Sequence, residues 1–305
     1  TVVIGPAAAS ASYLNMNLVV HAALATGCDA LHPGYGFLSE RAAFARLCAA
    51  HGITFIGPSA EVIERLGDKI AARRLAIEIG VPVVPGEDHI TSAAEAKAAA
   101  ARIGYPALLK AAAGGGGRGM RVVNEERELT DAFLQASAEA QSAFGDGSIY
   151  IERYLTRIRH IEIQVLGDER TVLHLGERDC SSQRRNQKLV EESPSPVLDA
   201  ALRGRMGEAA VKIARHIGYT SAGTVEFILD DASGEFYFME MNTRIQVEHP
   251  VTEMVTGIDL VKAQIGIAAG TPIPFTQQDV QWRGHAIECR INAEDHAQDF
   301  MPCPG

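Results

Sequence analysis

The chain has 305 residues, of which 47% are hydrophobic, and a formal net charge of −10 at pH 7. This length allows a substantial core, in one large unit or in two to three smaller ones, so we expect a folded, soluble protein. The negative charge and the lack of a long Lys/Arg run argue against nucleic acid or an anionic membrane as the main partner, because both attract clustered positive charge. We find no apolar run long enough to span a bilayer and no signal-peptide pattern.

The five cysteines are widely spaced and include no Cys-x-x-Cys pair, which argues against a disulfide framework and a zinc site. We therefore expect a reducing compartment: the cytoplasm, or a mitochondrion or plastid if the protein is eukaryotic and has lost a transit peptide. The chain begins within an expected strand at residues 1–4 and stops in the turn-like residues 302–305. We therefore expect a truncated protein.

Apolar and helical segments alternate in the first part of the chain. We predict strands at residues 1–4, 30–31 and 54–56, and helices at residues 17–25 and 40–51. This alternation predicts a parallel sheet with crossover helices over residues 1–66. A charged helix then leads to a turn-rich segment at 81–86, so we place a linker helix at 67–82.

The next segment, residues 83–154, predicts a small α+β domain. Ser92 and Glu95 form a Ser-x-x-Glu capping box that opens an alanine-rich helix ending at Ile103. Strands are predicted at 107–110, 120–123 and 149–154, with a second helix at 126–144.

Residues 155–305 form the last predicted domain. Its pattern indicates antiparallel strands at 160–166, 171–177, 224–229 and 236–242, with a helix at 202–217. We therefore predict a chain of mixed α/β and α+β class, with a parallel sheet first and antiparallel sheets after it.

A run of four glycines, Gly114 to Gly117, follows Lys110 between two predicted strands. Adjacent glycines let backbone N–H groups surround an anion, because no Cβ obstructs them. The segment lacks the Gly-Lys-Ser/Thr of a P-loop, and it leads into a strand rather than the helix of a dinucleotide fingerprint. A glycine run can also be a flexible linker, but its position favours a clamp over phosphates.

The strands at 224–229 and 236–242 predict a hairpin with two facing carboxylates. A turn centred near Ser233 pairs Glu226 with Glu240, because antiparallel partners share a constant sum of residue numbers. Alternation places Asn242 on the same face as Glu240. Opposed carboxylates among apolar residues repel without a cation, and oxygen ligands suit Mg²⁺ together with nucleotide phosphates. The alternative is an amphipathic hairpin with two solvent-facing glutamates.

Further polar groups follow this hairpin and the earlier strands. Arg244 offers a planar donor fork for a small oxyanion such as bicarbonate, and Glu248 could act as a base beside it. A surface ion pair between these two residues is the alternative. The polar run at 177–188 could be a solvated loop, and the polar face from His160 to Gln164 could be solvent-exposed.

Together these segments resemble the biotin carboxylase family, a branch of the ATP-grasp enzymes, over essentially the whole chain. The motifs stand in the family's order at residues 32–40, 67–69, 110–120, 177–188, 240–250 and 284–295. The resemblance implies an ATP-grasp fold with a partial N-terminal domain (the pre-ATP-grasp domain), a small lid domain carrying the glycine loop, and an incomplete C-terminal antiparallel domain. It implies ATP-dependent carboxylation of biotin by bicarbonate through carboxyphosphate.

The resemblance also implies the site residues. It assigns ATP contacts to Lys69, Lys110, Gly116, Gly117, Glu152, Arg153, Tyr154, Leu155, His160, Gln183 and Asn186, the last standing where many members have histidine. It assigns Mg²⁺ or Mn²⁺ to Glu226, Glu240 and Asn242, and bicarbonate to Lys188, Arg244, Gln246, Val247 and Glu248. Glu248 is the implied general base, Arg290 the residue that stabilises the biotin enolate, and Tyr35 a neighbour of biotin.

The implied partners are a biotin carboxyl carrier protein or domain and a carboxyltransferase subunit or domain, with a homodimer for the full-length protein. Asn186 favours an acyl-CoA carboxylase, such as the acetyl-CoA carboxylase of fatty acid biosynthesis, while pyruvate and urea stay open as acceptors. Two other functions also stay open: another ATP-grasp carboxylate–amine ligase, and a non-catalytic nucleotide-binding or assembly module.

Overall fold

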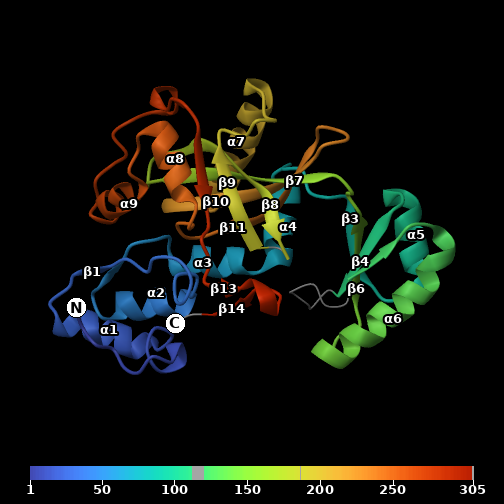
Figure 1. Cartoon of the computed structure of the whole chain (residues 1–305), viewed down its shortest axis with the longest axis horizontal. Coiled ribbons are helices and arrows are strands. Elements are labelled where there is room, and N and C mark those ends of the chain that lie inside the picture. The colour runs from blue at the N-terminus through green and yellow to red at the C-terminus, as the bar shows by residue number, and fades with distance from the viewer. Residues whose placement is uncertain (112–119, 186, 304–305) are drawn as a thin grey trace. The chain divides into compact units, whose positions relative to one another are not determined.

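The structure is a computed structural model that describes residues 1–111, 120–185 and 187–303, without the side chains of residues 69, 70, 143 and 144 (Figure 1). The chain divides into two compact units. Unit 1 comprises Thr1–Pro82, Arg159–Leu229 and Glu235–Gly305, and unit 2 comprises Val83–Ile158 and Asp230–Gly234.

The N-terminal part of unit 1 is a small α/β layer. Its elements are η1 (Ala9–Ala11), α1 (Met16–Ala25), β1 (Ala30–Leu31), α2 (Ala42–Ala50), β2 (Thr54–Phe55), α3 (Ala60–Gly67) and α4 (Lys69–Glu78). β1 and β2 pair in parallel, which confirms the predicted parallel pairing. The predicted strand at residues 1–4 is wrong. This segment pairs with no described strand, and Val3 is 88% exposed, so its apolar residues have no sheet to cover.

The rest of unit 1 is built on a six-stranded sheet in the order β11-β10-β7-β8-β9-β12. Its strands are β7 (Ile158–Gly167), β8 (Val172–Arg184), β9 (Gln187–Ser193), β10 (Ser221–Asp230), β11 (Phe236–Asn242) and β12 (Ala286–Cys289). The pairs β7–β8, β8–β9, β9–β12 and β10–β11 are antiparallel. β8 was predicted to end at Glu177 but continues to Arg184, so the polar run after Glu177 is strand rather than loop.

A β-bulge in β8 decides which face each of its side chains occupies. His174 pairs with Val165 on β7, whereas Glu177 pairs with Ile163, so three steps along β8 oppose two along β7. Gly176 lies within the bulge at φ +87°, a conformation that favours glycine. The bulge therefore places His174 on one face and Arg178 on the other.

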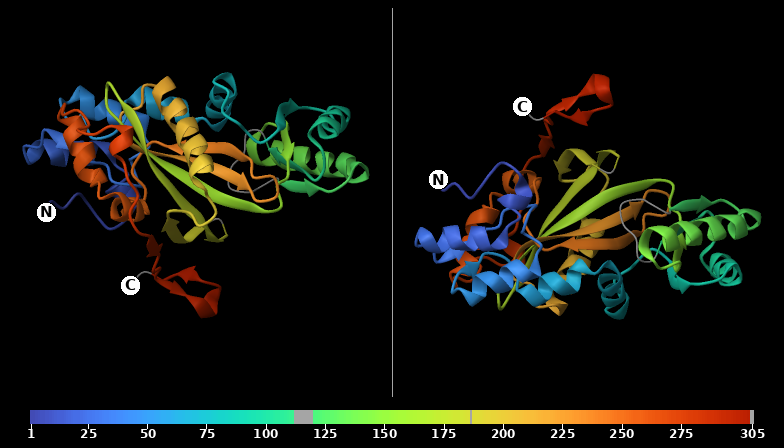
Figure 2. Two further views of the ribbon diagram at one scale, coloured as in Figure 1. Left: turned by 90° about the horizontal axis from the view of Figure 1, so that it is seen from above. Right: turned by 90° about the horizontal axis from the view of Figure 1, so that it is seen from below.

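Helices complete unit 1. They are α7 (Ala200–His216), α8 (His249–Thr256) and α9 (Leu260–Ala268), followed by the short η2 (Gln277–Asp279) and η3 (His296–Gln298) and by a two-stranded ribbon of β13 (Glu294–Asp295) and β14 (Met301–Pro302). Figure 2 shows α7 along one face of the large sheet. Arg203 of α7 binds the buried carboxylate of Glu177 there, with Nε–Oε2 and Nη2–Oε1 distances of 2.7 Å.

Unit 2 is a four-stranded sheet covered by two helices. Its strands are β3 (Gly86–Ile90), β4 (Ala107–Ala111), β5 (Arg121–Val123) and β6 (Ile149–Arg153), in the order β3-β6-β4-β5, and its helices are α5 (Ala93–Ile103) and α6 (Glu126–Phe144). The predicted capping box is confirmed, because Glu95 N donates to Ser92 Oγ and the Glu95 carboxylate accepts from Ser92 N. Leu109, Leu129 and Ile151 form part of its apolar core.

Within the described ranges, no helix is both long and apolar enough to cross a membrane.

Candidate active site

The predicted facing carboxylates are present in the β10–β11 hairpin. Glu226 pairs with Glu240, and Thr224 pairs with Asn242. A register shift follows Glu226, so that Phe227 pairs with Phe238 instead of Met239. The sum of the residue numbers of paired positions is therefore as predicted at the polar end of the hairpin. It changes by one at the apolar end, because the bulge inserts an extra residue in β11. The alternative of two solvent-facing glutamates is wrong for Glu226, which is 5% exposed.

Arg178 organises the face of the sheet next to Glu226. Its side chain is fully buried, and all five of its N–H groups have an acceptor. They donate to Glu162 Oε1 at 2.5 Å, Gln164 Oε1 at 2.7 Å, Thr252 Oγ1 at 2.9 Å, Gln246 Oε1 at 2.9 Å and Thr224 Oγ1 at 3.1 Å. The interpretation of 177–188 as a solvated loop is wrong for residues 177–180, which are buried in β8, and that of the β7 polar face as solvent-exposed is wrong for Glu162 and Gln164. Side chains from α8 and from residues 243–248 form a polar layer over this face.

Lys188 joins three carboxylates beside Arg178. Its Nζ lies 2.5 Å from Glu162 Oε2, 2.7 Å from Glu248 Oε1 and 3.1 Å from Glu226 Oε1. Burial disfavours the ammonium charge, but the carboxylates outweigh burial and raise the pKa of Lys188 above its ordinary value. A permanent positive charge therefore lies among the candidate base and metal ligands.

Glu226 receives hydrogen bonds at Oε1 from Asn242 Nδ2 and Gln246 Nε2, each at 2.8 Å. Its Oε2 lies 3.0 Å from His160 Nε2. Burial would raise the pKa of Glu226, but His160 and Lys188 hold it at about 2. The same contact with Glu226, aided by Glu162, overcomes burial and raises the pKa of His160. Glu226 is therefore a carboxylate throughout the neutral pH range.

A divalent cation fits these donors. Glu226 and Glu240 face each other on paired strands, and hard oxygen ligands of this kind suit Mg²⁺. The ligand atoms of His160, Glu162 and Glu226 also lie within 4.8 Å of one another, which adds a carboxylate that the sequence did not suggest as a ligand. In this structure, Lys188 supplies positive charge next to Glu226 Oε1, and His160 lies against Glu226 Oε2.

Arg244 is held in place from a distant segment. Its Nε donates to Glu40 Oε2 at 3.0 Å, and Thr243 N donates to the other oxygen of Glu40 at 3.3 Å. Arg244 Nη2 also donates to Asn242 Oδ1 at 3.1 Å. The alternative of a surface ion pair between Arg244 and Glu248 is wrong, because Glu248 is 2% exposed and pairs with Lys188 and Arg290.

Arg290 connects Glu248 to a second carboxylate. Its Nη2 lies 2.8 Å from Glu248 Oε2, and its Nε lies 2.6 Å from Glu191 Oε1. Glu191 stands opposite Glu288 in the β9–β12 pair, and each has a buried oxygen without a hydrogen-bond partner in the described part of the chain. Burial raises the pKa of both carboxyl groups, and the charge of Glu191 adds to the rise at Glu288. Sequence reasoning missed this carboxyl pair, although its two strands carry the family motifs.

The remaining predicted residues are spread over both units. In unit 2, Lys110 of β4 forms an ion pair with Glu152 of β6, while Arg153 and Tyr154 at the end of β6 are exposed and Leu155 is half-buried. In unit 1, Gln183 donates from Nε2 to Cys180 O at 2.9 Å, Val247 is half-buried, and Tyr35 is 50% exposed. The predicted residues Gly116, Gly117 and Asn186, and the side chain of Lys69, lie outside the described residues.

Family models match two parts of the chain. Residues 1–63 match the biotin carboxylase N-terminal domain, and residues 68–276 match the ATP-binding domain of the carbamoyl-phosphate synthase L chain. The second match alone covers more than half of the chain.

Individual relatives agree with these models. The biotin carboxylase of a Nostoc species is 58% identical over all of this chain, which spans 68% of that protein. A pyruvate carboxylase component of Methanothermobacter thermautotrophicus is 55% identical over 99% of the chain and 62% of its own length.

A solved structure extends the likeness to the fold. The biotin carboxylase domain dimer of Hydrogenobacter thermophilus 2-oxoglutarate carboxylase, in complex with MgADP, ADP and bicarbonate, has a TM-score of 0.82 and 55% identity, covering 95% of this chain and 64% of that one. The chain therefore belongs to the biotin carboxylase family of ATP-dependent carboxylating ligases, and it has their ATP-grasp fold.

Proposed function

We propose that the protein containing this chain carboxylates biotin on a biotin carboxyl carrier protein or domain, using bicarbonate and ATP. The observation that carries the proposal is the position of Glu248. It is buried between two cations, Lys188 at 2.7 Å and Arg290 at 2.8 Å. The same two cations attract an anion such as bicarbonate, which would bring its proton within reach of the Glu248 carboxylate.

In the proposed first step, Lys188 and Arg244 hold bicarbonate with Gln246 and the backbone of Val247, and Glu248 accepts the bicarbonate proton. The resulting oxygen nucleophile attacks the γ-phosphorus of ATP, the bond to ADP breaks, and carboxyphosphate forms. Phosphoryl transfer depends on positioning and charge neutralisation, which these cations supply.

In the second step, carboxyphosphate breaks down to CO₂ and phosphate. The phosphate takes the N1′ proton of biotin, Arg290 stabilises the enolate, and N1′ bonds to the carbon of CO₂. Glu191 positions Arg290 for this role through the 2.6 Å contact at Nε. We place Tyr35 near biotin.

We assign a bound Mg²⁺, or Mn²⁺ in its place, to Glu226, Glu240 and Asn242. The ion would neutralise phosphate charge. His160, Gln183 and Asn186 are the assigned nucleotide contacts in unit 1, together with Lys69. The assigned nucleotide contacts of unit 2 are Lys110, Gly116, Gly117, Glu152, Arg153, Tyr154 and Leu155.

We also propose the division of the chain into domains. Residues 83–154 would form a lid domain. The other segments would be an N-terminal domain at 1–66, a linker helix at 67–82 and a C-terminal domain at 155–305.

We further propose an acyl-CoA carboxylase, with acetyl-CoA as the preferred acceptor and fatty acid biosynthesis as its context. Asn186 supports this choice. One relative is a component of pyruvate carboxylase, so pyruvate is the second candidate. A carboxyltransferase partner and a homodimer complete the proposal, the latter supported by the dimer of the Hydrogenobacter domain. We propose a cytoplasmic location, or a mitochondrial or plastid one for a eukaryotic protein.

Glu248→Gln tests the base assignment in the natural protein that contains this chain. We expect bicarbonate-dependent ATP cleavage to fall by roughly 10²- to 10⁴-fold, because the amide cannot accept the proton. The matched control is Glu192→Gln on β9, whose carboxylate contacts His285 at the sheet edge. Wild-type cleavage in Glu248→Gln would show that Glu248 is not the base.

The reaction itself is tested by measuring ADP release with bicarbonate and free biotin. Stimulation by an amine in place of biotin would favour a carboxylate–amine ligase. ATP binding without any turnover in the presence of biotin would favour a non-catalytic module.

A further inference from the structure

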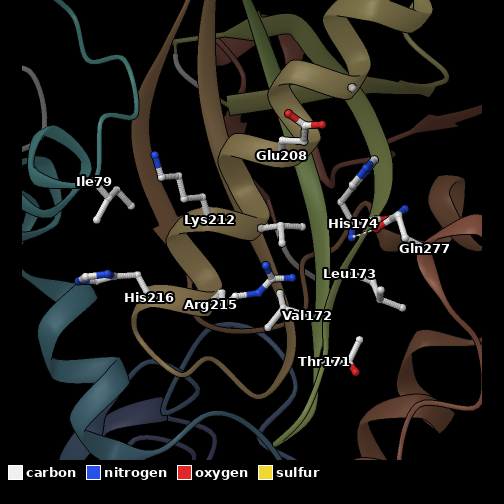
Figure 3. A pocket seen from close by; sticks show the side chains of 12 residues that line it. Ile79, Thr171, Val172, Leu173, His174, Glu208, Lys212, Arg215, His216 and Gln277 are labelled. Carbon is white, nitrogen blue, oxygen red and sulfur yellow. Dashed lines mark hydrogen bonds between the residues drawn. The ribbon is translucent and has the colours of Figure 1, made fainter.

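A cavity of about 710 Å³ lies in unit 1 between α7 and the start of β8 (Figure 3). This volume is within the ~300–1,000 Å³ typical of small-molecule sites. Ile79 borders one end, and His174 and Gln277 border the other. None of its lining residues has a role in the proposed reaction.

The cavity lies on the opposite face of the large sheet from the candidate active site. His174 pairs with Val165, while Arg178 pairs with Glu162, and the bulge at Gly176 turns these two β8 side chains to different faces. Arg178 lies with the acidic cluster, whereas His174 lies under α7, where its ring contacts the position of Gly207. A ligand in this cavity would therefore not compete directly with ATP.

The wall formed by α7 combines one apolar, one acidic and two basic side chains. Glu208, Val211, Lys212 and Arg215 lie at helical spacings of three and four residues, so they form one stripe along the helix. In Figure 3, the Lys212 side chain extends toward Ile79. Neither Lys212 nor Arg215 has an ion-pair partner among the residues that the structure describes.

The floor of the cavity is less polar. Val172 and Leu173 of β8 line it together with Val211. The Gln277 side chain hydrogen-bonds to the backbone of His174, since its Oε1 accepts from His174 N at 2.9 Å and its Nε2 donates to His174 O at 2.8 Å. His174 is 9% exposed, and its Nδ1 has no hydrogen-bond partner in the described part of the chain. The cavity thus offers an apolar floor, a buried imidazole and, beside Glu208, two cations without an ion-pair partner among the described residues.

We propose that this cavity is a second ligand site, which binds an organic anion with an apolar body and one carboxylate or phosphate group. The apolar body would cover Val172 and Val211, because burying these side chains is favourable. The anionic group would lie between Lys212 and Arg215. Lys212 and Arg215 attract an anion locally on a chain whose net charge of −10 repels it elsewhere.

The test uses the fluorescent aromatic sulfonate 8-anilinonaphthalene-1-sulfonate, which has the proposed combination of apolar body and anionic group. We expect saturable binding that persists in MgATP. The double variant Lys212→Glu/Arg215→Glu should weaken binding at least about tenfold, because two attractive charges become repulsive. Val211→Trp fills the cavity and should weaken binding without changing its charge.

The matched control is Arg205→Glu/Lys262→Glu, which makes the same change in charge at two exposed cations outside the cavity. Binding should stay within about twofold of wild type. Equal losses in both double variants would overturn the proposal, because the effect would then be one of net charge. Unchanged binding in both Lys212→Glu/Arg215→Glu and Val211→Trp would also overturn it. Circular dichroism of each variant checks that it is folded.

Competition defines the ligand class. Octanoate or octyl phosphate should displace the probe, and their relative potency distinguishes a carboxylate from a phosphate ligand. Neutral octanamide should be at least about tenfold weaker than the better of the two. Equal displacement by octanamide would overturn the anionic class, and displacement by MgATP would place the probe in the nucleotide site instead.

Discussion

The sheets of units 1 and 2 use alternating side chains in different ways. In the large sheet, the polar side chains of Glu162 and Gln164 are fully buried and hydrogen-bonded to Arg178. In the small sheet, Lys110 and Glu152 also meet across neighbouring strands, but Lys110 stays 35% exposed, and the buried residues are apolar. The same sequence pattern therefore produces a buried ionic network in one unit and a partly solvated ion pair in the other.

The difference comes from what covers each polar face. Thr252 of α8 and Gln246 close over Arg178 and provide two of its five acceptors. Burial removes water from these charges, so every donor must find a protein partner. The large sheet thus holds its charged groups in set positions, as a reaction site requires.

Arg178→Met tests this comparison with the largest expected effect. Removing the guanidinium leaves Glu162 with an uncompensated oxygen, so we expect unit 1 to lose about 3–5 kcal/mol of unfolding free energy. Urea unfolding followed by Trp282 fluorescence reports unit 1, because Trp282 is the single tryptophan of the chain. The control Arg121→Met removes an exposed ion pair of unit 2, at 3.3 Å from Glu139, and should cost at most about 1 kcal/mol by circular dichroism. Similar losses in both variants would contradict the comparison.

Gly176→Ala tests the bulge that separates the two faces of the large sheet. Alanine at φ +87° strains the backbone, and its Cβ would lie 2.1 Å from Trp282 Nε1. We therefore expect the clash to destabilise the variant by about 1–3 kcal/mol in addition to the strain. Gly104→Ala in unit 2 has a similar φ of +85° and meets no atom within 4 Å, so it isolates the strain alone. Thermal unfolding of both variants measures the difference. Equal destabilisation would mean that Trp282 moves aside at no cost.

Glu288→Gln has the smallest expected effect and depends on pH. The pKa of Glu288 in the folded protein is raised above its ordinary value of 4.5. The protonated carboxyl group therefore contributes its full share of the unfolding free energy below pH 4.5, and this share is lost as pH rises through the folded-state pKa. Glutamine mimics the protonated form, so the variant should gain stability relative to wild type between about pH 4 and pH 7.

Glu95→Gln in unit 2 should show the opposite sign. Hydrogen bonds from Thr91 lower the pKa of Glu95, so its contribution is present above pH 4.5 and is lost as pH falls. This variant should be less stable than wild type at pH 7 and approach it near pH 3. Urea midpoints at four pH values measure both variants, and parallel curves would contradict the assigned pKa directions.

Local sequence patterns predicted much of the fold. The capping box at Ser92 predicted the start of α5, and the turn at Ser233 predicted the pairing of Glu226 with Glu240, because both depend on a few neighbouring residues. The strand predicted at residues 1–4 is wrong because a strand needs a partner, which no local pattern supplies. The extent of β8 was underestimated for a related reason, since a polar run becomes strand when neighbouring strands satisfy its backbone.

The sequence by itself determined the pairing of Glu226 with Glu240, the capped start of α5 and the motifs that place the chain in its family, because these depend on local spacing and residue type. Only the tertiary structure decided that Arg178 donates hydrogen bonds to five side chains and that Glu40 accepts one from Arg244, 204 positions along the chain. It also decided that Glu191 and Glu288 face each other. It also placed Lys212 and Arg215, which have no ion-pair partner in the described part of the chain, beside a cavity on the other face of the sheet. The physical reason is that charge partners are chosen by burial and by distance in space, which spacing along the chain does not encode.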